Sequence, residues 1–327
     1  MYAFFKNKYL PIAEAKMSIL THAFHYGTAC FEGVRGNWNE DEGQVYIFRA
    51  QDHMERLINS AKVLRIKIRF TAEEMVNIAA EVVRKGNHKE DIYIRPVAYK
   101  SAEVVANMKA HLLEDDVMVF AFPLGNYLDP NKGIHCGTSS WRRIDDLSIP
   151  ARAKINGSYV NSVLAKTEAV ESGFEEAIML NQDGHVSEGS GENIFIVKNG
   201  TLITPAPGDN ILLGITRDSV ITLAKQELGM ETVERQLDRS ELYQADEVFL
   251  TGTAAHLTPV SKIDHRAIAD GKIGQVTQRL QALYFDVIRG KNKKYMQWCH
   301  PVYDKPSKSS AKSNGAAVSA VRASDRR

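Results

Sequence analysis

The sequence has 327 residues, of which 44% are hydrophobic and 25% are charged, as in ordinary globular proteins of one or two domains. Its 41 lysines and arginines nearly balance 40 aspartates and glutamates, so no sequence-independent attraction to nucleic acid or an anionic membrane is expected. No apolar run approaches the roughly 20 residues of a membrane-spanning helix, and no secretory signal pattern opens the chain. The three scattered cysteines lack metal-ligand spacing, so we expect a cytoplasmic protein without disulfides.

The first half of the chain predicts two helices and then two strands. Apolar residues recur at helical spacing over 52–66. Thr71 and Glu74 form a capping-box pattern, which predicts a second helix that begins there. Strands are predicted at about 92–99 and 117–122, because apolar and β-branched residues dominate both segments.

The second half mixes further helices with short strands. Asp183-Gly184 and Asn199-Gly200 are hairpin-turn signals between apolar segments, so at least part of the sheet must be antiparallel. Gly229 follows an amphipathic segment at the position of a helix C-cap. The predicted helices cover about 158–171, 216–228 and 275–288, and the predicted strands cover about 177–180, 193–197 and 247–251.

Together these elements predict a mixed α/β fold of two domains with largely antiparallel or mixed sheets. We expect a small N-terminal domain at 1–123, an interdomain loop at 124–133 and a larger C-terminal domain at 134–303. The segment 304–327 is rich in serine, lysine and arginine without apolar periodicity, which predicts a disordered tail.

The stretch Val-Ser-Glu-Gly-Ser-Gly-Glu-Asn-Ile-Phe at 186–195 places two acids among glycines. It lacks the third glycine of a dinucleotide fingerprint and leads into a predicted strand rather than a helix. His185 and Glu188 lie three residues apart, but no third ligand is nearby, so we expect no metal site. A solvated turn and a carboxylate held against a cationic ligand atom both remain open for this stretch.

Two segments could bind a phosphate. The segment 213–218 opens a predicted helix, whose free backbone N–H groups and the Thr216 hydroxyl could hold an anion. An ordinary N-cap role for Thr216 explains this pattern about as well. The small residues of 251–255 at a strand end would let the backbone approach a ligand closely, although a tight turn fits equally.

Lys154 stands between small and apolar residues, and Tyr159 follows five residues later. A desolvated lysine can act as a nucleophile toward an aldehyde, although most lysines are solvated surface charges. A nucleophilic lysine, two anion-sized sites and an acid in a constrained turn are together what pyridoxal 5'-phosphate requires, because its aldehyde, phosphate and pyridinium nitrogen each need one of them.

At this point several motifs resemble those of one family, the branched-chain amino acid aminotransferases of the fold-type IV pyridoxal-phosphate class. The resemblance extends from His22 to about Tyr303, with the motifs in the family's order. They are THAFHYGTACFEGVRG (21–36), HMERL (53–57), YIRP (93–96), SSWRR with IPARAK (139–154), YVNSVLAKTEA (159–169), VSEGSGENIF (186–195), LGITRD (213–218) and FLTGTAA (249–255).

The resemblance implies roles at the cofactor. Lys154 would bind the cofactor covalently and move protons during catalysis, and Glu188 would hold the pyridine nitrogen. Tyr159 would hydrogen-bond the ring oxygen, Leu212 would pack on the ring face, and Glu192 would support the turn. The expected phosphate ligands are Arg56, Ile215, Thr216 and Thr253.

The resemblance also implies a substrate pocket. Its expected walls are Tyr26, Phe31, Tyr93 and Tyr127. The Tyr93 hydroxyl and the backbone at Thr253 and Ala254 would hold the α-carboxylate, and Arg95 would meet the distal carboxylate of glutamate or 2-oxoglutarate.

The activity so implied is ping-pong transamination of leucine, isoleucine and valine with 2-oxoglutarate, in a homodimer or higher homo-oligomer. A D-amino acid or (R)-amine transaminase and an aminodeoxychorismate lyase share this fold and remain alternatives. A cofactor-free binding protein on the same scaffold is a third reading, which the pairing of Lys154 with Glu188 argues against.

Overall fold

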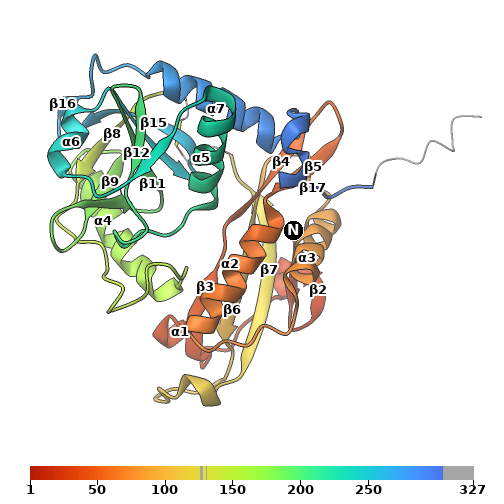
Figure 1. The fold of residues 1–327 in the computed structure, drawn as a ribbon. Coiled ribbons are helices and arrows are strands. Elements are labelled where there is room, and N and C mark those ends of the chain that lie inside the picture. The colour runs from red at the N-terminus through yellow and green to blue at the C-terminus, as the bar shows by residue number, and fades with distance from the viewer. Residues whose placement is uncertain (126–127, 130, 305–327) are drawn as a thin grey trace, which may run out of the picture.

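The computed structural model describes residues 1–125, 128–129 and 131–304, which form two β-sheets with helices packed against each (Figure 1). The chain builds most of the first sheet, then the second, and returns at its end to the first. The mixed α/β class predicted from the sequence is therefore confirmed. The helices are α1 (His22–Tyr26), α2 (Ala50–Val63), α3 (Ala72–Gly86), α4 (Tyr159–Glu171), α5 (Ile215–Leu228), α6 (Arg239–Gln244) and α7 (Gln275–Ile288).

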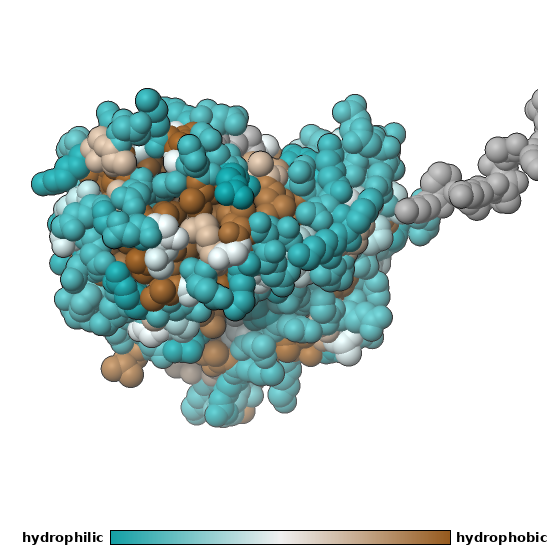
Figure 2. Space-filling model, turned by 45° about the horizontal axis from the view of Figure 1, so that its top comes forward, coloured by the Kyte–Doolittle hydropathy of each residue, from teal (hydrophilic) through white to brown (hydrophobic). Residues whose placement is uncertain are grey.

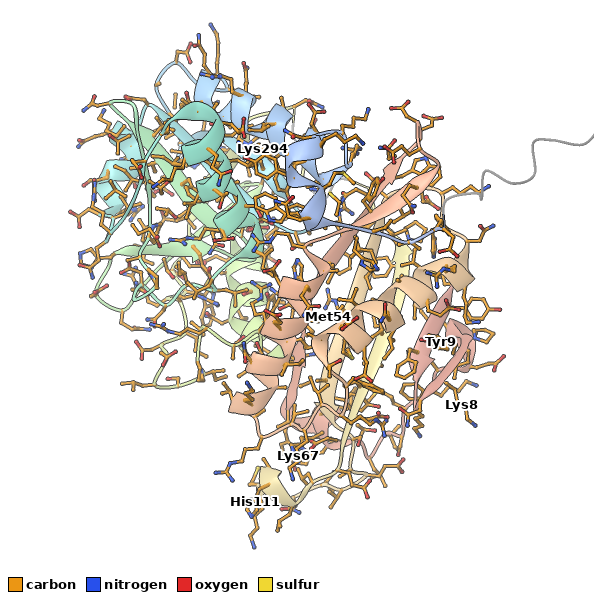
Figure 3. The ribbon with its side chains drawn as sticks, turned by 45° about the vertical axis from the view of Figure 1, so that its right-hand side comes forward. Lys8, Tyr9, Met54, Lys67, His111 and Lys294 are labelled. Carbon is orange, nitrogen blue, oxygen red and sulfur yellow. The ribbon has the colours of Figure 1, made fainter. Side chains whose placement is uncertain are left out.

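The first sheet is antiparallel throughout its described pairs, in the order β17-β5-β4-β6-β7-β1-β2, with β3 paired to β6. Helices α2 and α3 cover it, and Met54, labelled on α2 in Figure 3, is fully buried in the core between them. The strands are β1 (Tyr2–Phe5), β2 (Lys8–Pro11), β3 (Ala29–Phe31), β4 (Val34–Asn39), β5 (Gln44–Phe48), β6 (Ile92–Lys100), β7 (Asp115–Pro123) and β17 (Cys299–Pro301).

The second sheet is mixed, in the order β10-β9-β8-β15-β14-β11-β12-β13, with β16 paired to β15. Its parallel pairs are β8 with β9, β8 with β15, and β12 with β13. Helices α5 and α7 pack on β14 and share an aromatic and aliphatic core with it. The strands are β8 (Ile134–Thr138), β9 (Glu176–Leu180), β10 (Val186–Gly189), β11 (Asn193–Lys198), β12 (Thr201–Thr204), β13 (Thr232–Glu234), β14 (Glu247–Gly252), β15 (His256–Ile263) and β16 (Arg266–Ala267).

Local sequence signals account for several element ends. The Thr71 hydroxyl accepts a hydrogen bond from the Glu74 backbone, and the Glu74 carboxylate accepts one from the Thr71 backbone, so the predicted capping box is confirmed at α3. The hairpin turn between β11 and β12 has Asn199 and Gly200 at positive φ angles of 49° and 75°, as an Asn-Gly turn requires. Gly229 ends α5 at a φ of 64°.

The division into domains at 1–123 and 134–303 stays a prediction. The C-terminal strand β17 pairs with β5, so the chain crosses back to the first sheet after α7 (Figure 1). The predicted tail lies outside the described residues from 305 onward.

The surface drawn in Figure 2 is mostly hydrophilic, with apolar side chains gathered over the part of the molecule built around the second sheet. Among the described helices, none combines the length and the apolar character needed to cross a membrane. All three cysteines are buried and free.

Candidate active site

Two adjoining cavities lie between the sheets and share Lys154 and Tyr159 in their walls. The first extends over the start of α5 and is lined mainly by polar side chains. The second opens beside it and has aromatic residues of the first sheet on one side. Of the residues expected at the cofactor, all eight line the first cavity: Arg56, Lys154, Tyr159, Glu188, Leu212, Ile215, Thr216 and Thr253.

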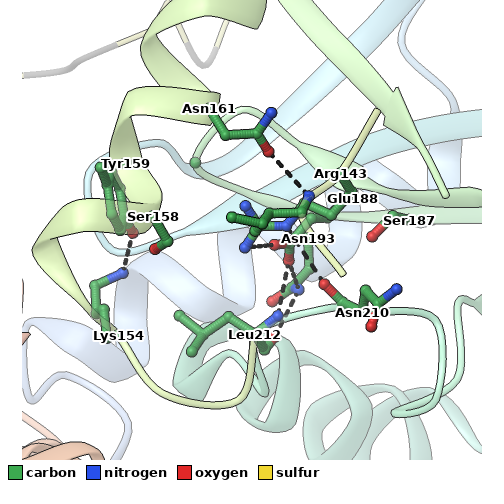
Figure 4. Close-up of polar contacts among 12 residues, drawn as sticks. Arg143, Lys154, Ser158, Tyr159, Asn161, Ser187, Glu188, Asn193, Asn210 and Leu212 are labelled. Carbon is green, nitrogen blue, oxygen red and sulfur yellow. Dashed lines mark hydrogen bonds and ion pairs between the residues drawn. The ribbon is translucent and has the colours of Figure 1, made fainter. Parts of the chain in front are cut away.

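Lys154 is held where the two sheets meet. Its backbone carbonyl accepts a hydrogen bond from the Phe31 backbone at 3.0 Å, and its backbone N–H donates to the Ser60 hydroxyl at 3.1 Å. Its Nζ lies 2.6 Å from the Tyr159 hydroxyl, at the start of α4 (Figure 4), and 5.0 Å from the centre of the Phe31 ring. The amine is therefore fixed between two aromatic rings, with the Tyr159 hydroxyl as a polar partner.

Glu188 lies on β10 and is buried. Its carboxylate pairs with the Arg143 guanidinium at 2.8 Å and accepts hydrogen bonds from the Asn193 side chain at 2.9 Å and the Leu212 backbone at 3.1 Å (Figure 4). Burial raises the pKa of Glu188, and the charges of Arg143 and Lys154 oppose that rise. The carboxylate is thus oriented by donors while burial leaves it a strong partner for a cation.

Helix α5 presents its N-terminus to the first cavity. Gly214 is the N-cap, so the alternative role of Thr216 as the N-cap is wrong; Thr216 is the second residue of the helix. The backbone N–H groups of Ile215 and Thr216 consequently have no acceptor within the helix and favour an anion. A side chain at Gly214 would bring its Cβ within 2.0 Å of the Asn193 amide oxygen, so only glycine allows this close approach.

Arg56 reaches the same helix end from α2. Its Nη1 donates to the Leu213 carbonyl at 2.7 Å, directly before Gly214. Its Nε and Nη2 donate to the two oxygens of Glu32 at 2.7 and 2.8 Å. The His53 Nδ1 lies 2.7 Å from Glu32 as well. The arginine is therefore held on two sides.

The turn after β10 is closed by Glu192, the second glutamate of the stretch 186–195. The Glu192 carboxylate accepts a hydrogen bond from the Gly191 backbone at 3.1 Å and lies beside Gly189. Burial, and then the charge of Glu176, raise the pKa of Glu192 to about 8. Glu176 accepts a hydrogen bond from the Ser190 hydroxyl at 2.6 Å. Two buried carboxylates, Glu176 and Glu192, therefore hold this turn by hydrogen bonds.

The second cavity brings together Phe31, Tyr93, Arg95, Thr253 and Ala254. The Arg95 guanidinium lies 4.3 Å from the centre of the Phe31 ring, and its Nη2 donates to the Tyr93 hydroxyl at 3.1 Å. The Arg95 Nε is buried without a partner among the described residues. This pocket therefore combines apolar walls with a guanidinium whose Nε has no hydrogen-bond partner among the described residues.

One predicted wall residue lies outside both cavities. Tyr26 is on α1, where it is 36% exposed and its hydroxyl accepts a hydrogen bond from the Ala106 backbone; it lines neither of the two cavities. Tyr127 falls outside the described residues. In the part of the chain that the structure describes, no cluster of three histidine, cysteine or acidic side chains could hold a metal ion.

Four residues of the site went unassigned at the sequence level. Arg143 and Asn193 orient Glu188, and Glu32 and His53 orient Arg56. All four lie inside the motifs quoted above. The motifs marked these positions, but they did not predict which residues would contact one another. The pairing of Arg143 with Glu188 joins two different motifs and follows only from the fold.

The polar groups of the first cavity fit pyridoxal 5'-phosphate. Lys154 offers an amine, Glu188 an oriented buried acid, and the start of α5 a set of free N–H donors. The Thr251 hydroxyl, which also lines this cavity, is buried without a hydrogen-bond partner among the described residues. A phosphorylated pyridine aldehyde would satisfy these groups together.

Comparisons with known proteins agree with this arrangement. The model of the family described as "Amino-transferase class IV" matches residues 29–263. A protein of Aquifex aeolicus named "Probable branched-chain-amino-acid aminotransferase" is 54% identical over 93% of this chain and 97% of its own length.

Two solved structures are similar over nearly their whole length. A branched-chain aminotransferase from the archaeon Thermoproteus uzoniensis, solved with norvaline, has a TM-score of 0.88 and 43% identity, covering 93% of this chain and 99% of that one. A branched-chain amino acid aminotransferase from Thermobaculum terrenum, in its PLP-form, has a TM-score of 0.87 and 37% identity, covering 93% and 98%.

Proposed function

This chain belongs to the class IV aminotransferase family, with pyridoxal 5'-phosphate as its cofactor, and from that premise we propose that it catalyses ping-pong transamination of branched-chain L-amino acids with 2-oxoglutarate. One observation carries the proposal: the cleft of Lys154 and Glu188 opens directly into a pocket that sets the Arg95 guanidinium among apolar walls.

The cofactor, when bound, draws electron density from the substrate α-carbon into its pyridine ring. Glu188 would hold the proton on the ring nitrogen, because its carboxylate is already oriented by Arg143 and Asn193. Tyr159 would hydrogen-bond the ring oxygen and Leu212 would cover the ring face. The phosphate would lie at Ile215, Thr216, Thr253 and Arg56.

Lys154 would move the proton at the substrate α-carbon. A freed amine beside the Tyr159 hydroxyl, 2.6 Å away, can accept a proton and return it to a neighbouring carbon, acting first as base and then as acid. The aromatic rings of Phe31 and Tyr159 flank this amine and would keep water from it. The same residue then serves both halves of the reaction.

The second pocket would accept two unlike side chains. Phe31 and Val163 offer apolar contact for leucine, isoleucine or valine. The Arg95 guanidinium, which lines this pocket, would bind the distal carboxylate of glutamate. Tyr93 has room for its hydroxyl only because residue 33 is glycine: a Cβ there would lie 1.9 Å from that oxygen. Tyr93 and the backbone at Thr253 and Ala254 would hold the α-carboxylate.

We further propose that the enzyme acts in the cytoplasm as a homodimer or higher homo-oligomer. The apolar side chains of Ile19, Phe24 and Val160 are 81%, 76% and 64% exposed, respectively, which favours burial against another copy. The contribution of Tyr26 and Tyr127 to the pocket walls stays a proposal.

A substrate panel tests the function. The purified enzyme would be mixed with pyridoxal phosphate and 2-oxoglutarate, and glutamate followed with L-leucine, L-isoleucine, L-valine, D-alanine or (R)-1-phenylethylamine. We expect turnover of the three branched L-amino acids, lost in a Lys154→Ala variant. Turnover confined to D-alanine or the amine would overturn the substrate assignment while leaving the cofactor site intact.

A further inference from the structure

Two buried side chains, Glu32 and His53, contact Arg56 or its partner beside the cofactor cleft and have no part in the reaction steps. Glu32 follows β3 and is 0% exposed, and His53 is 2% exposed on α2. The Glu32 backbone N–H donates to the Pro96 carbonyl at 2.9 Å, which fixes the acid to the first sheet. Glu32 is therefore anchored to the first sheet, whereas the proposed phosphate site begins at α5 across the cleft.

Glu32 is ionised, and both of its carboxylate oxygens accept hydrogen bonds within the trio of Glu32, His53 and Arg56. Burial alone would raise its pKa, but the charge and hydrogen bonds of Arg56, with the hydrogen bond from His53, lower it to about 2. Because an ionised carboxylate only accepts hydrogen bonds, His53 must donate its Nδ1–H. Burial lowers the pKa of His53, which keeps this ring neutral.

The hydrogen bonds of Arg56 determine which of its donors face the cleft. A guanidinium carries five N–H donors, and three of them are used: Nε and one N–H of Nη2 by Glu32, and one N–H of Nη1 by the Leu213 carbonyl. One N–H on each terminal nitrogen is left by these contacts within the described chain. The Nη2 hydrogen that is left points away from the Nε edge bound by Glu32, so it can donate to an oxygen of a phosphate.

We propose that Glu32, supported by His53, is a positioning residue that turns the remaining donors of Arg56 toward the cofactor phosphate. The inference rests on the proposed phosphate role of Arg56. It assigns to Glu32 a share of the phosphate's binding free energy, although the acid carries the same charge sign as the phosphate and its two oxygens already accept from Arg56 and His53.

Charge alone leads to the opposite expectation. Glu32 neutralises Arg56, so removing its charge would leave a more positive site and strengthen phosphate binding by simple Coulomb attraction. Positioning instead requires that removal of Glu32 weakens phosphate binding, because the freed guanidinium can rotate away from the helix end. The sign of the change thus separates the two accounts.

The test measures dissociation constants of the apoenzyme for pyridoxal 5'-phosphate and for pyridoxal, which lacks the phosphate. The ratio of the pyridoxal constant to the pyridoxal 5'-phosphate constant reports the contribution of the phosphate alone, and it falls when the phosphate is bound more weakly. In Glu32→Gln we expect this ratio to fall at least about tenfold, the size of one lost charge-assisted hydrogen bond, with pyridoxal affinity nearly unchanged. Arg56→Ala should lower the ratio by as much or more, and the double variant should add nothing to Arg56→Ala.

A second pair of variants guards against misfolding of Glu32→Gln. His53→Leu removes the donor to Glu32 and should lower the ratio, whereas His53→Asn keeps a donor near the Nδ1 position and should restore it. A ratio that is unchanged or higher in Glu32→Gln, or equal in the two His53 variants, would refute the positioning role. An unchanged ratio in Arg56→Ala would instead refute the proposed phosphate role of Arg56.

Discussion

At the scale of single residues, the environment of Glu188 determines whether it can hold a cation. Burial raises its pKa and favours the protonated form, while the Arg143 guanidinium at 2.8 Å stabilises the charged form. Arg143 is itself 7% exposed, so the pair is shielded from water and from salt screening. The arginine therefore favours the ionised form of the acid.

We predict that Arg143→Gln lowers kcat by about tenfold or more near neutral pH, the scale of one lost buried charge interaction. Without the guanidinium, the pKa of Glu188 rises further. Activity that needs the ionised acid is lost as pH falls through that pKa, so the acid limb of the kcat profile should move to higher pH. The measurement is kcat against pH with L-leucine.

The neighbouring Arg142 is exposed and provides the matched control. Arg142→Gln removes the same charge at the adjacent position of the chain and should leave both kcat and the acid limb in place. An Arg143→Gln profile that superimposes on that of the control would contradict the role given to this ion pair.

Sequence patterns predicted part of this candidate site. Lys154, Tyr159 and Glu188 could be proposed because each shows its chemistry locally, as a lysine in apolar surroundings or an acid among glycines. Arg143 and Glu32 could not, because a long side chain near an acid in space leaves no periodic trace in the sequence. Their partners lie 45 and 24 residues away, respectively.

At the scale of elements, the first turn of α5 depends on the close packing of Gly214. Its missing side chain leaves room for the Asn193 amide, which bonds both the Glu188 carboxylate and the Leu212 carbonyl at 2.9 Å. One glycine therefore connects the helix N-terminus with the acid of the site. The sequence identified the helix but left Thr216 as a candidate for its cap, since hydroxyl residues are the commoner caps.

We predict that Gly214→Ala weakens pyridoxal phosphate binding by at least about tenfold, because a Cβ within 2.0 Å of the Asn193 oxygen must displace that amide. Equilibrium dialysis of the apoenzyme would measure the dissociation constant. Gly208→Ala is the control, because a Cβ there meets no atom within 4 Å. Equal constants for the two variants would show that the amide can shift without loss.

Turn and cap chemistry explains why other elements were predictable. The Thr71 capping box and the Asn199-Gly200 turn depend on neighbours within four residues, so the local sequence alone predicts them. The pairing of β17 with β5 joins residues some 250 positions apart, and nothing in the short strand Cys299–Pro301 distinguishes it from a loop. Such pairing depends on the finished sheet.

At the scale of the whole molecule, His256 connects the two sheets. It begins β15 of the second sheet, and its Nε2 lies 2.9 Å from the guanidinium of Arg35 on β4 of the first. Burial, and then the charge of Arg35, lower the pKa of His256 to about 3. The ring is therefore a neutral acceptor between the sheets.

This contact predicts a pH-dependent stability. An unfolded histidine titrates near pH 6.5, so between there and about pH 3 the unfolded chain binds a proton that the folded chain does not. Stability from this group is thus lost as pH falls, by up to about 1.4 kcal/mol per pH unit. His256→Gln, which keeps an acceptor, should reduce the loss in urea-unfolding free energy between pH 7 and 5.

The exposed His111 gives the control for this comparison. His111→Gln removes one histidine without breaking a contact between the sheets, and its pH dependence should match that of the unaltered protein. If His256→Gln and His111→Gln lose stability equally between the two pH values, the buried ring is not the source.

The assembly is a second property of the whole molecule. Gly27 at the end of α1 approaches Gly157 before α4, where an added Cβ would lie 2.9 Å from the Cα of Gly157. The exposed apolar residues Phe24 and Val160 therefore project from adjoining segments. We predict a mass of at least two chains by light scattering, and dissociation in Val160→Asp.

Val233, on the edge strand β13, is 41% exposed and serves as the comparison. Val233→Asp adds the same charge at a site remote from α1 and α4 in the sequence and should leave the mass unchanged. A monomeric unaltered protein, or a Val160→Asp variant of undiminished mass, would contradict the proposed interface.

The central claim is that the enzyme transfers amino groups in two separable half-reactions within the one site that contains Lys154. A single half-reaction tests it most directly: enzyme loaded with pyridoxal phosphate, mixed with excess L-leucine and no 2-oxo acid, with the released 2-oxo acid quantified. We predict one equivalent of 4-methyl-2-oxopentanoate per active site, and a second equivalent only after 2-oxoglutarate is added. No release without 2-oxoglutarate would contradict the ping-pong account, and release from D-leucine alone would contradict the substrate assignment.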